Sequence, residues 1–381
     1  MHSLILMSDT GGGHRALSRA IAAGLDETSQ GSDQSSLLDP FMTAGERLPG
    51  MIMRQYGPLI RRFPGLYGVI YHFLDVPGRY ATIARTLGRS VVQKIVDAAI
   101  REQSDVLIIA HPLAVESAML AIEDIRKKTG RTLPSIAMVT ELVSIHWSWI
   151  DKRITRYFAA TEEIQRGLVH RGVDASRITL TGLPVGPAFG RITESQAETR
   201  RRLRLNERRT TALVLAGGEG GGPVEHLVPR LSKALPDLQI MVVCGRNTRL
   251  KSNLESYGLP PTTQIYGFAD NMAELMHASD FVLTKGGPQT LSEALAAARP
   301  VVVTDLLPGQ EQGNGAYIVR HGAGYLALTQ PEILAAARRL FDDPSERARL
   351  SKNAHEIGHR AAAARVANEV RINIAAANHV S

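Results

Sequence analysis

The sequence predicts an α/β protein made of two doubly wound, Rossmann-like domains. Three observations lead to this fold class. Short apolar runs alternate with segments of helical periodicity in both halves of the chain. Several runs are rich in valine and isoleucine and apolar throughout, which is typical of parallel strands buried on both faces. In each half the first run leads into a glycine-rich loop, the place where such sheets bind ligands.

The expected strands fall into two sets. The first set lies at residues 3–7, 106–110, 136–139 and 157–160, and the second at 212–215, 240–243, 281–283 and 301–304. Helical periodicity fills the spaces between them; Leu17, Ile21 and Leu25, for example, fall on one face of a helix. Strand, loop and helix therefore repeat through both halves.

The two sets are separated by residues 182–190, which contain three glycines and two prolines. Such a segment continues neither a helix nor a central strand. We therefore expect a first domain over residues 1–188 and a second over 189–363. A helix at about 364–381 is expected to pack back on the first domain.

Composition excludes several classes of protein. No apolar run approaches the roughly 18–20 residues that span a bilayer, and the chain begins on a strand-sized run without a signal-peptide pattern. Cys244 is the only cysteine among the 381 residues, which excludes an internal disulfide and a zinc site of several cysteines. These features favour the cytoplasm.

The formal net charge of +7 is concentrated in one stretch. Residues 47–94 hold eight basic side chains against one acid, Asp75, so the rest of the chain is neutral in sum. Within 51–86 these basic groups are interleaved with large apolar ones, which predicts binding to an anionic phospholipid surface. Ordinary amphipathic helices with a buried apolar side are the alternative interpretation.

Four loops carry the remaining candidates. Gly12, Gly13 and His14 follow the first strand, and residues 216–223 hold five glycines within six positions. Gly287 opens a third helix after a buried strand, which would make an anion cradle of backbone amides and helix dipole. The fourth loop, 308–314, is rich in hydrogen-bonding side chains that suit a sugar. The chain contains no Asp-x-Asp, the usual carboxylate signature of a metal-bound diphosphate, so neither a metal nor another cofactor is expected.

These loops resemble a known family. Ser8 to His14 is similar to the opening of the monogalactosyldiacylglycerol synthases, which belong to glycosyltransferase family 28 together with processive diacylglycerol glucosyltransferases. The likeness runs in order through the following segments: 111–113, 139–142, 157–163, 182–185, 217–220, 244–247, 285–294, 308–311 and 313–314. It departs from the family pattern at Glu141, where Asp is usual, at Trp147, where the plant branch has Pro, and at Gln289, which replaces a Gly. The resemblance implies a GT-B fold, in which the two domains face a central cleft.

The resemblance also implies an activity, the inverting transfer of a galactose or glucose from a UDP-sugar to diacylglycerol. His14 would be the general base, for which a near-neutral pKa is suitable. Glu293 would bind ribose, the backbone around Phe268 would meet uracil, and Arg246 would contact the diphosphate. The full expected donor set is Gly217, Gly218, Glu219, Gly220, Arg246, Phe268, Gly287, Pro288, Gln289, Thr290, Glu293, Gln310 and Glu311, the last two on sugar hydroxyls.

The acceptor and the membrane are assigned to the first domain. The expected residues are Gly12, Gly13, Arg54, Arg61, Arg62, Arg79, His146 and Trp149. For Trp149 a role at a lipid headgroup and a buried place in the core are equally compatible with the sequence. The expected partners are thus a UDP-hexose, diacylglycerol and an anionic membrane, not nucleic acid, with the protein peripheral on the inner face of the cell membrane.

Three other functions stay open at this point. The same fold could serve a different lipid acceptor, such as a polyprenyl-linked or sterol-like lipid. A UDP-sugar epimerase would share the donor site, although it needs no basic segment at 47–94. A non-enzymatic membrane-binding module would retain the fold but have no need of His14 and Glu293.

Overall fold

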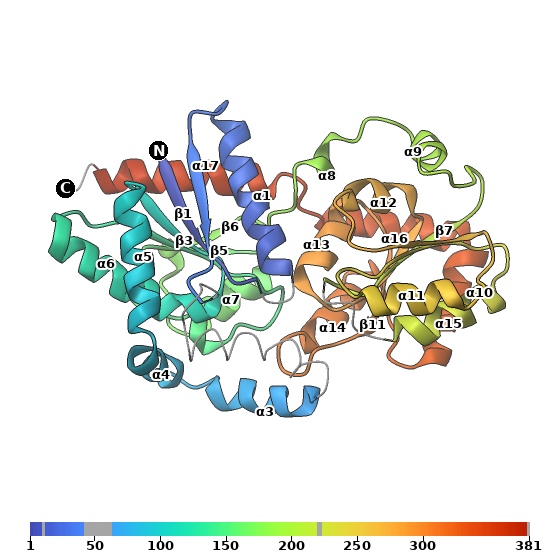
Figure 1. Cartoon of the computed structure of the whole chain (residues 1–381), viewed down its shortest axis with the longest axis horizontal. Helices are drawn as coiled ribbons and strands as arrows, with labels where there is room; N and C mark the ends of the chain where they lie inside the picture. The colour runs from blue at the N-terminus through green and yellow to red at the C-terminus, as the bar shows by residue number, and fades with distance from the viewer. Residues whose placement is uncertain (10–11, 42–62, 219–222, 379–381) are drawn as a thin grey trace.

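The computed structural model describes residues 1–9, 12–41, 63–218 and 223–378. Over these residues the chain forms two six-stranded parallel sheets, one in each half, with helices around both (Figure 1). The predicted fold class, two doubly wound α/β domains, is confirmed.

The first sheet is built from the first half of the chain. Its strands are β1 (His2–Leu6), β2 (Gln34–Leu38), β3 (Val106–Ile109), β4 (Ser135–Met138), β5 (Arg156–Ala159) and β6 (Ile178–Leu180), in the order β2-β1-β3-β4-β5-β6. All four residues of β3 are fully buried, and their side chains alternate between the apolar layers on the two faces. Burial on both faces explains why the sequence of β3 is apolar at every position.

The second sheet has the same architecture. Its strands are β7 (Thr211–Leu215), β8 (Gln239–Val243), β9 (Thr263–Tyr266), β10 (Phe281–Lys285), β11 (Val301–Asp305) and β12 (Gly324–Leu326), in the order β12-β11-β10-β7-β8-β9. β7 and β10 are neighbours at the centre, in the register Leu213 to Val282.

The strand order fixes where each domain can bind a ligand. From β1 the chain goes to β2 on one side and then to β3 on the other, so the direction of winding reverses between β1 and β3. In the second sheet it reverses between β7 and β10. Loops at such a reversal diverge and leave a crevice at the carboxyl ends of the strands. The candidate loops after β1, β7 and β10 therefore all follow strands next to a reversal, where sheets of this kind bind ligands.

The helices connect the strands and complete the layers. In the first half they are α1 (Gly13–Thr28), α3 (Pro64–Leu74), α4 (Arg79–Leu87), α5 (Arg89–Arg101), α6 (Val115–Thr129) and α7 (Glu162–His170). In the second they are α8 (Ala188–Arg191), α9 (Gln196–Arg202), α10 (Val224–Ala234), α11 (Thr248–Ser256), α12 (Met272–Ala278), α13 (Pro288–Ala296), α14 (Gln312–Arg320), α15 (Gln330–Asp342) and α16 (Pro344–Ile357). Short 3-10 turns occur at Pro112–Ala114, Trp147–Trp149 and Ala175–Arg177.

The last helix, α17 (Ala362–Asn378), returns to the first sheet and packs along α1 (Figure 1). Gly24 of α1 lies against the backbone of Ala363, where a Cβ on Gly24 would come within 2.6 Å of the carbonyl oxygen. Arg371 of α17 donates hydrogen bonds to Asp33, to the Thr28 hydroxyl and to the backbone of α1. Residue 188 falls between the two sheets, and the domain limits drawn from the sequence stay a prediction.

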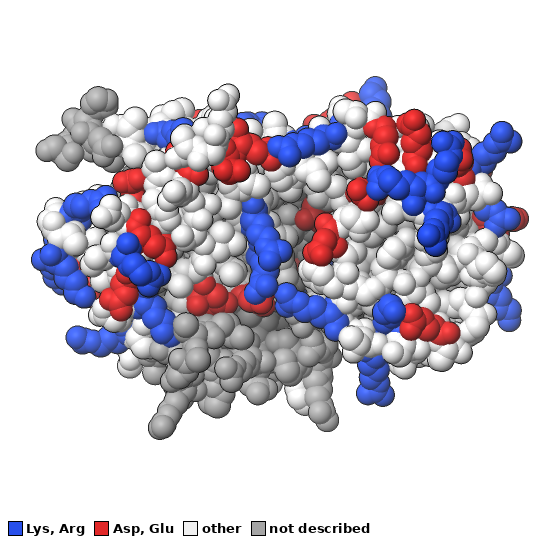
Figure 2. All heavy atoms as spheres, turned by 45° about the horizontal axis from the view of Figure 1, so that its top comes forward, with Lys and Arg blue, Asp and Glu red and all other residues white. Residues whose placement is uncertain are grey.

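Charges are mixed over the surface that Figure 2 presents. Basic and acidic side chains are interspersed over both halves in this view. Many charged side chains of the described residues are paired, as are Arg153 with Glu123 and Lys251 with Glu255. Among the described residues, no helix combines the length and the apolar character needed to cross a membrane.

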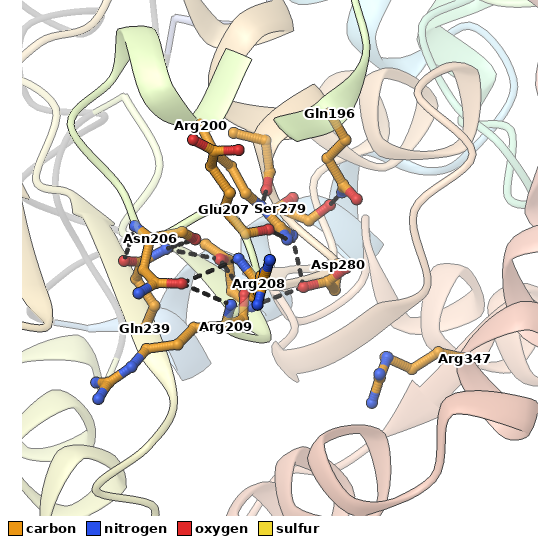
Figure 3. Close-up of polar contacts among 12 residues, drawn as sticks. Gln196, Arg200, Asn206, Glu207, Arg208, Arg209, Gln239, Ser279, Asp280 and Arg347 are labelled. Atoms are coloured by element: carbon orange, nitrogen blue, oxygen red, sulfur yellow. Dashed lines mark hydrogen bonds and ion pairs between the residues drawn. The ribbon is translucent and has the colours of Figure 1, made fainter. Parts of the chain in front are cut away.

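A buried polar cluster fastens α9 to the second sheet (Figure 3). The Arg200 guanidinium donates to the Asp280 carboxylate at 2.7 Å, to the Ala278 carbonyl at 2.8 Å and to the Glu207 carbonyl at 3.1 Å. Asp280 also accepts the backbone N–H of Thr211, the first residue of β7. Because each buried charge has its partners, the cluster is a structural clamp that orders the segment between the two sheets.

Candidate active site

The glycine loops of the two domains face each other. Gly12 has the left-handed backbone angle φ of 78°, and a Cβ placed on it would lie 3.6 Å from the Cα of Gly218. A Cβ on Gly13 would lie 3.5 Å from the side chain of Gln289, at the start of α13. Three loops that are far apart in the sequence therefore meet at the junction of the domains. His14 stands at this junction, in the first turn of α1.

The orientation of His14 is set by the end of β3. Its Nδ1 atom lies 2.9 Å from the carbonyl oxygen of Ala110. A carbonyl oxygen can only accept, so Nδ1 carries the proton and Nε2 keeps its lone pair. In this tautomer the imidazole can take a proton at Nε2, as a general base must.

A second histidine packs on the first. The rings of His14 and His111 are in edge contact, with centroids 4.4 Å apart. His111 is buried, and its Nδ1 accepts the backbone N–H of Leu113. Burial lowers the pKa of both rings, that of His14 to about 4 and that of His111 well below 6.5. The near-neutral pKa expected for His14 is therefore wrong, because desolvation outweighs the hydrogen bond to Ala110.

In the second domain the loop after β7 rests on another glycine. Gly217 adopts φ of 73°, and Gly245 lies beneath it with φ of 62°. A Cβ on Gly245 would come within 2.5 Å of the Gly217 carbonyl, so no other residue fits at position 245. The backbone N–H of Arg246 donates to the Gly218 carbonyl at 3.1 Å and fixes the loop further. Glu219 and Gly220, also expected in the donor site, lie outside the described residues.

Helix α13 begins with Gly287 as its N-cap and Pro288 as its first residue. Its first turn, which includes Gln289 and Thr290, directs backbone N–H groups out of the helix end, where an anion is stabilised. The Gln289 amide donates to Glu293 at 2.9 Å and to the Pro184 carbonyl at 3.3 Å. Burial raises the pKa of Glu293 to about 7. The carboxyl is thus poised to ionise when hydroxyl donors reach it.

The Lys285 side chain lies between the second and third glycine loops. A Cβ on Gly217 would be 3.3 Å from its Cε, and one on Gly287 would be 3.6 Å from the same atom. The Lys285 ammonium donates to Glu311 at 3.2 Å, and Glu311 also accepts the backbone N–H of Leu307. Lys285 was not among the expected donor residues, although its place between a buried strand and a glycine loop could have made it a candidate.

A polar chain crosses the junction beside these loops. The Gln310 amide nitrogen donates to Glu141 at 2.9 Å, and its oxygen accepts the Tyr67 hydroxyl at 2.9 Å. Burial, with the charge of Glu311 nearby, raises the pKa of Glu141 to about 8. The second carboxyl oxygen of Glu141 is buried and has no hydrogen-bond partner within the described part of the chain. Glu141 is therefore largely protonated at neutral pH.

Arg246 and Phe268 lie together at the edge of the site. The guanidinium stands 5.7 Å from the centre of the Phe268 ring, which is exposed. Its NH1 atom is also 3.8 Å from Asp9, which pairs with Arg15 behind the first glycine loop. The side chain of Arg246 thus reaches across the junction from the second domain to the first.

The residues expected at the acceptor and membrane take different places. Arg54, Arg61 and Arg62 lie outside the described residues. Arg79 stacks its guanidinium 4.4 Å from the ring of Phe73 at the surface. Trp149 is fully buried in the core of the first domain, the second of its two interpretations.

His146 is buried, and both of its ring nitrogens are engaged. Nδ1 accepts the backbone N–H of Ser148, and Nε2 donates to the carbonyl of Tyr71 in α3. In the structure its contacts hold α3 against the first domain.

Comparisons with known proteins identify the family of the chain. The family model for monogalactosyldiacylglycerol synthase matches residues 14–185, and the glycosyltransferase family 28 C-terminal domain matches residues 211–367. A probable monogalactosyldiacylglycerol synthase of Glycine max is 31% identical over 361 residues, and the match covers 92% of this chain and 67% of that protein. Monogalactosyldiacylglycerol synthase 3 of Arabidopsis thaliana is 30% identical over 92% of this chain and 77% of its own length. The chain belongs to the monogalactosyldiacylglycerol synthase family. As a family member it is a glycosyltransferase, and the predicted resemblance is confirmed.

Solved structures show the fold. MurG of Acinetobacter baumannii superimposes with a TM-score of 0.60 at 14% identity, over 97% of this chain and 99% of its own. Anabaena HepE in complex with UDP-glucose gives 0.58 at 15% identity, with complete coverage of both chains. A UDP-GlcNAc 2-epimerase of Neisseria meningitidis gives 0.63 at 13% identity, over 97% and 99%. These structures confirm the GT-B architecture of this monogalactosyldiacylglycerol synthase family member, and the fold alone does not separate transferases from epimerases.

Proposed function

We propose that the protein is an inverting hexosyltransferase that moves galactose or glucose from a UDP-sugar to diacylglycerol. The observation that carries this proposal is the tautomer of His14. Its Nδ1 is fixed on Ala110, and its Nε2 lone pair stays available at the junction of the glycine loops. A non-enzymatic module of this fold would have no need of such a base, and an epimerase would have no need of a surface that binds lipid.

The proposed reaction is a single displacement. The free hydroxyl oxygen of diacylglycerol attacks the anomeric carbon of the sugar, and His14 Nε2 takes the hydroxyl proton as this bond forms. The bond between the anomeric carbon and the phosphate oxygen breaks, and UDP leaves with the electron pair. Attack from the face opposite to UDP inverts the configuration at the anomeric carbon.

The donor is proposed to lie on the second domain. Glu293 would bind the ribose hydroxyls, and the backbone around Phe268 would meet the uracil. The negative charge that develops on UDP would be stabilised by the first turn of α13, Arg246 and Lys285. Since these groups supply positive potential, we propose that the reaction needs neither a metal nor another cofactor. Gln310 and Glu311 would hold the sugar hydroxyls.

The acceptor side is proposed to dock on an anionic phospholipid surface through α3. Large apolar side chains lie exposed along it, including Val69 with 66% and Phe73 with 59% of its surface accessible. Arg79 stands beside Phe73 and adds positive charge at the same place. A diacylglycerol acceptor stays in the bilayer, so the enzyme must approach it. The lone, buried thiol of Cys244 suits a reducing compartment, and we take the surface to be the inner face of the cell membrane.

The test uses purified protein, vesicles that contain diacylglycerol, and a panel of UDP-sugars, with the lipid products resolved by mass. The proposal expects a diacylglycerol product heavier by one or more hexose units. An epimerised UDP-sugar without any glycolipid would favour the epimerase. Absence of every product in vesicles that bind the protein would favour the non-enzymatic module.

A further inference from the structure

Helix α3 presents two distinct faces. Leu66, Val69, Ile70 and Phe73 are exposed, and their spacing of three, four and seven residues places them on one stripe. Tyr67, Gly68 and Tyr71 lie on the opposite stripe and face the protein. A helix of a water-soluble domain normally buries its large apolar side chains. In α3 four of them lie on the exposed face instead.

The inner stripe of α3 packs on the second domain, at the loop after β11. A Cβ on Gly68 would lie 3.0 Å from Pro308. Gly309, with φ of 84°, lies so close to Tyr71 that a Cβ there would be 2.6 Å from the ring. In Figure 1, α3 runs below the junction of the two halves, near α14. A helix encoded in the first half of the chain thus rests on the loop proposed to hold the sugar.

The C-terminal end of α3 is tied to the first domain. The Tyr71 carbonyl accepts the Nε2–H of His146, and Asp75 accepts the backbone N–H of Trp147 at 2.8 Å. Arg171 adds an ion pair to Asp75 at 3.6 Å. Helix α3 therefore contacts both the first domain and the loop after β11, and its outer face is the one proposed to meet the lipid surface.

The contact between Tyr67 and Gln310 fixes the orientation of the Gln310 amide. An amide side chain is fixed in one orientation when its oxygen accepts from one partner and its nitrogen donates to another. In Gln310 the oxygen accepts from Tyr67 and the nitrogen donates to Glu141. Without the Tyr67 hydroxyl, the Gln310 amide could turn about its last bond and present the wrong groups to a sugar.

We propose that Tyr67 is a positioning residue through which membrane docking of α3 sets the orientation of Gln310 for the donor sugar. This inference rests on the proposed function and deepens it, because it makes sugar recognition depend on the lipid surface. The two events share one free energy of coupling, so each must strengthen the other by the same factor. A neutral hydrogen bond accounts for a factor of roughly threefold to tenfold.

The experiment measures the Kd of UDP-galactose, UDP-glucose and UDP by calorimetry, with and without phosphatidylcholine–phosphatidylglycerol vesicles that lack diacylglycerol. Vesicles should tighten binding of the accepted UDP-sugar by roughly threefold to tenfold. The Kd of UDP should not change, because UDP has no hexose for Gln310 to touch. In the converse measurement, the UDP-sugar should raise vesicle affinity by the same factor.

Two variants distinguish loss of the Tyr67 hydroxyl from a general effect on the structure. Tyr67→Phe keeps the ring and the exposed stripe of α3, and it should abolish the effect of vesicles on UDP-sugar binding. Tyr80→Phe removes a hydroxyl of α4 that donates to the Leu113 carbonyl of the first domain, and it should keep the effect. Retention of the effect in Tyr67→Phe overturns the proposal, as does a wild-type UDP-sugar Kd that is equal with and without bound vesicles. Failure of wild type to bind vesicles overturns the docking step, and failure to bind any UDP-sugar overturns the proposed function itself.

Discussion

The Nδ1 atom of His14 lies 2.9 Å from the carbonyl oxygen of Ala110, the residue that follows β3. This contact joins the first turn of α1 to the centre of the first sheet. It gives the imidazole one tautomer and one ring orientation, both maintained by a rigid backbone rather than by another side chain. If His14 acts as the proposed base, it is thereby preorganised before any substrate binds.

Replacement of this base should stop the chemistry and spare the donor site. We expect His14→Ala to lower kcat by at least about 100-fold, the smaller end of the effect of general-base removal. The Kd of UDP should change little, because the proposed donor contacts lie on the second domain. The measurement is glycolipid formation on diacylglycerol vesicles, with His355→Ala, an exposed histidine of α16, as the control. Turnover near the wild-type rate in His14→Ala would remove His14 from the mechanism.

Glu293 should control nucleotide affinity. Loss of its hydrogen bonds to ribose in Glu293→Ala should weaken UDP binding by about 1.5–3 kcal/mol, the range for a bond to a charged group. The exposed acid Glu356 supplies the matched control, Glu356→Ala, for which the Kd of UDP should not change. Equal UDP affinity in both variants would place the ribose elsewhere.

The same carboxyl should make UDP binding dependent on pH. Its pKa is raised to about 7 by burial. In the proposed donor complex, ribose hydroxyls would donate to the ionised form. UDP affinity should therefore decrease as the pH falls through about 7. Glu293→Gln should remove the part of this dependence that does not come from the terminal phosphate of UDP, which titrates at about pH 6. Calorimetry between pH 6 and pH 8, in buffers of different ionisation enthalpy, would also detect the proton released on binding.

Donor binding and turnover should not need a divalent metal. The proposed positive groups are Lys285, Arg246 and the first turn of α13, and none of them is removed by a chelator. Excess EDTA should leave the rate of glycolipid formation largely unchanged. Loss of the rate with EDTA, together with recovery on addition of magnesium or manganese, would show that the diphosphate is bound through a metal.

Glu141 should make folding stability decrease with rising pH. Its pKa is about 8 in the folded protein and near the ordinary 4.5 when unfolded. Between these values the folded state retains a proton that the unfolded state releases. The contribution of Glu141 to the free energy of unfolding is therefore fully present below about pH 4.5 and is lost as the pH rises to about 8. Glu141→Gln removes this loss, so its Tm should rise relative to wild type as the pH increases from 5 to 8. A Tm difference that does not vary with pH would show that Glu141 ionises normally.

Binding to anionic vesicles should depend on the outer stripe of α3. The double variant Val69→Ser, Phe73→Ser should sediment less with vesicles than wild type, because it removes two inserted apolar side chains. Ile372→Ser is the matched control, since Ile372 of α17 is equally exposed at 59%. An equal loss of vesicle binding in both variants would show that any exposed apolar side chain promotes binding, wherever it lies on the surface.

The arginines of this segment should contribute as well. Each is worth about 1 kcal/mol near an anionic surface. Changing Arg54, Arg61, Arg62 and Arg79 to glutamine should weaken vesicle binding and reduce its dependence on salt. If this variant binds vesicles as well as wild type at low salt, the apolar stripe of α3 alone accounts for binding.

The sequence predicts the centre of each sheet better than its edges. Eight strands were expected, and all eight are present as β1, β3, β4, β5, β7, β8, β10 and β11. The other four described strands, β2, β6, β9 and β12, lie at the edges of the sheets. Edge strands are covered less completely, so polar residues such as Ser35 in β2 and Gln264 in β9 are tolerated and no apolar run marks them.

For the site, the sequence locates the loops but not their partners. Gly12, Gly217 and Gly287 could be recognised because each follows a buried strand. The contact of Tyr67 with Gln310 joins residues 243 positions apart and depends on how the two domains pack, which no local pattern specifies. The low pKa of His14 likewise arises from burial next to His111, and burial at a domain junction has no signature in composition.

The packing of α17 on α1 affects the order in which the domains are completed during synthesis, because the first domain of a chain usually completes its fold first. The first sheet leaves the ribosome early, but the helix that covers α1 is translated only after the whole second domain. Until then Gly24 and its apolar neighbours on α1 await a partner more than 300 residues away. The first domain therefore begins first and finishes last, and a chain interrupted anywhere before residue 362 leaves the ribosome with this face of α1 uncovered.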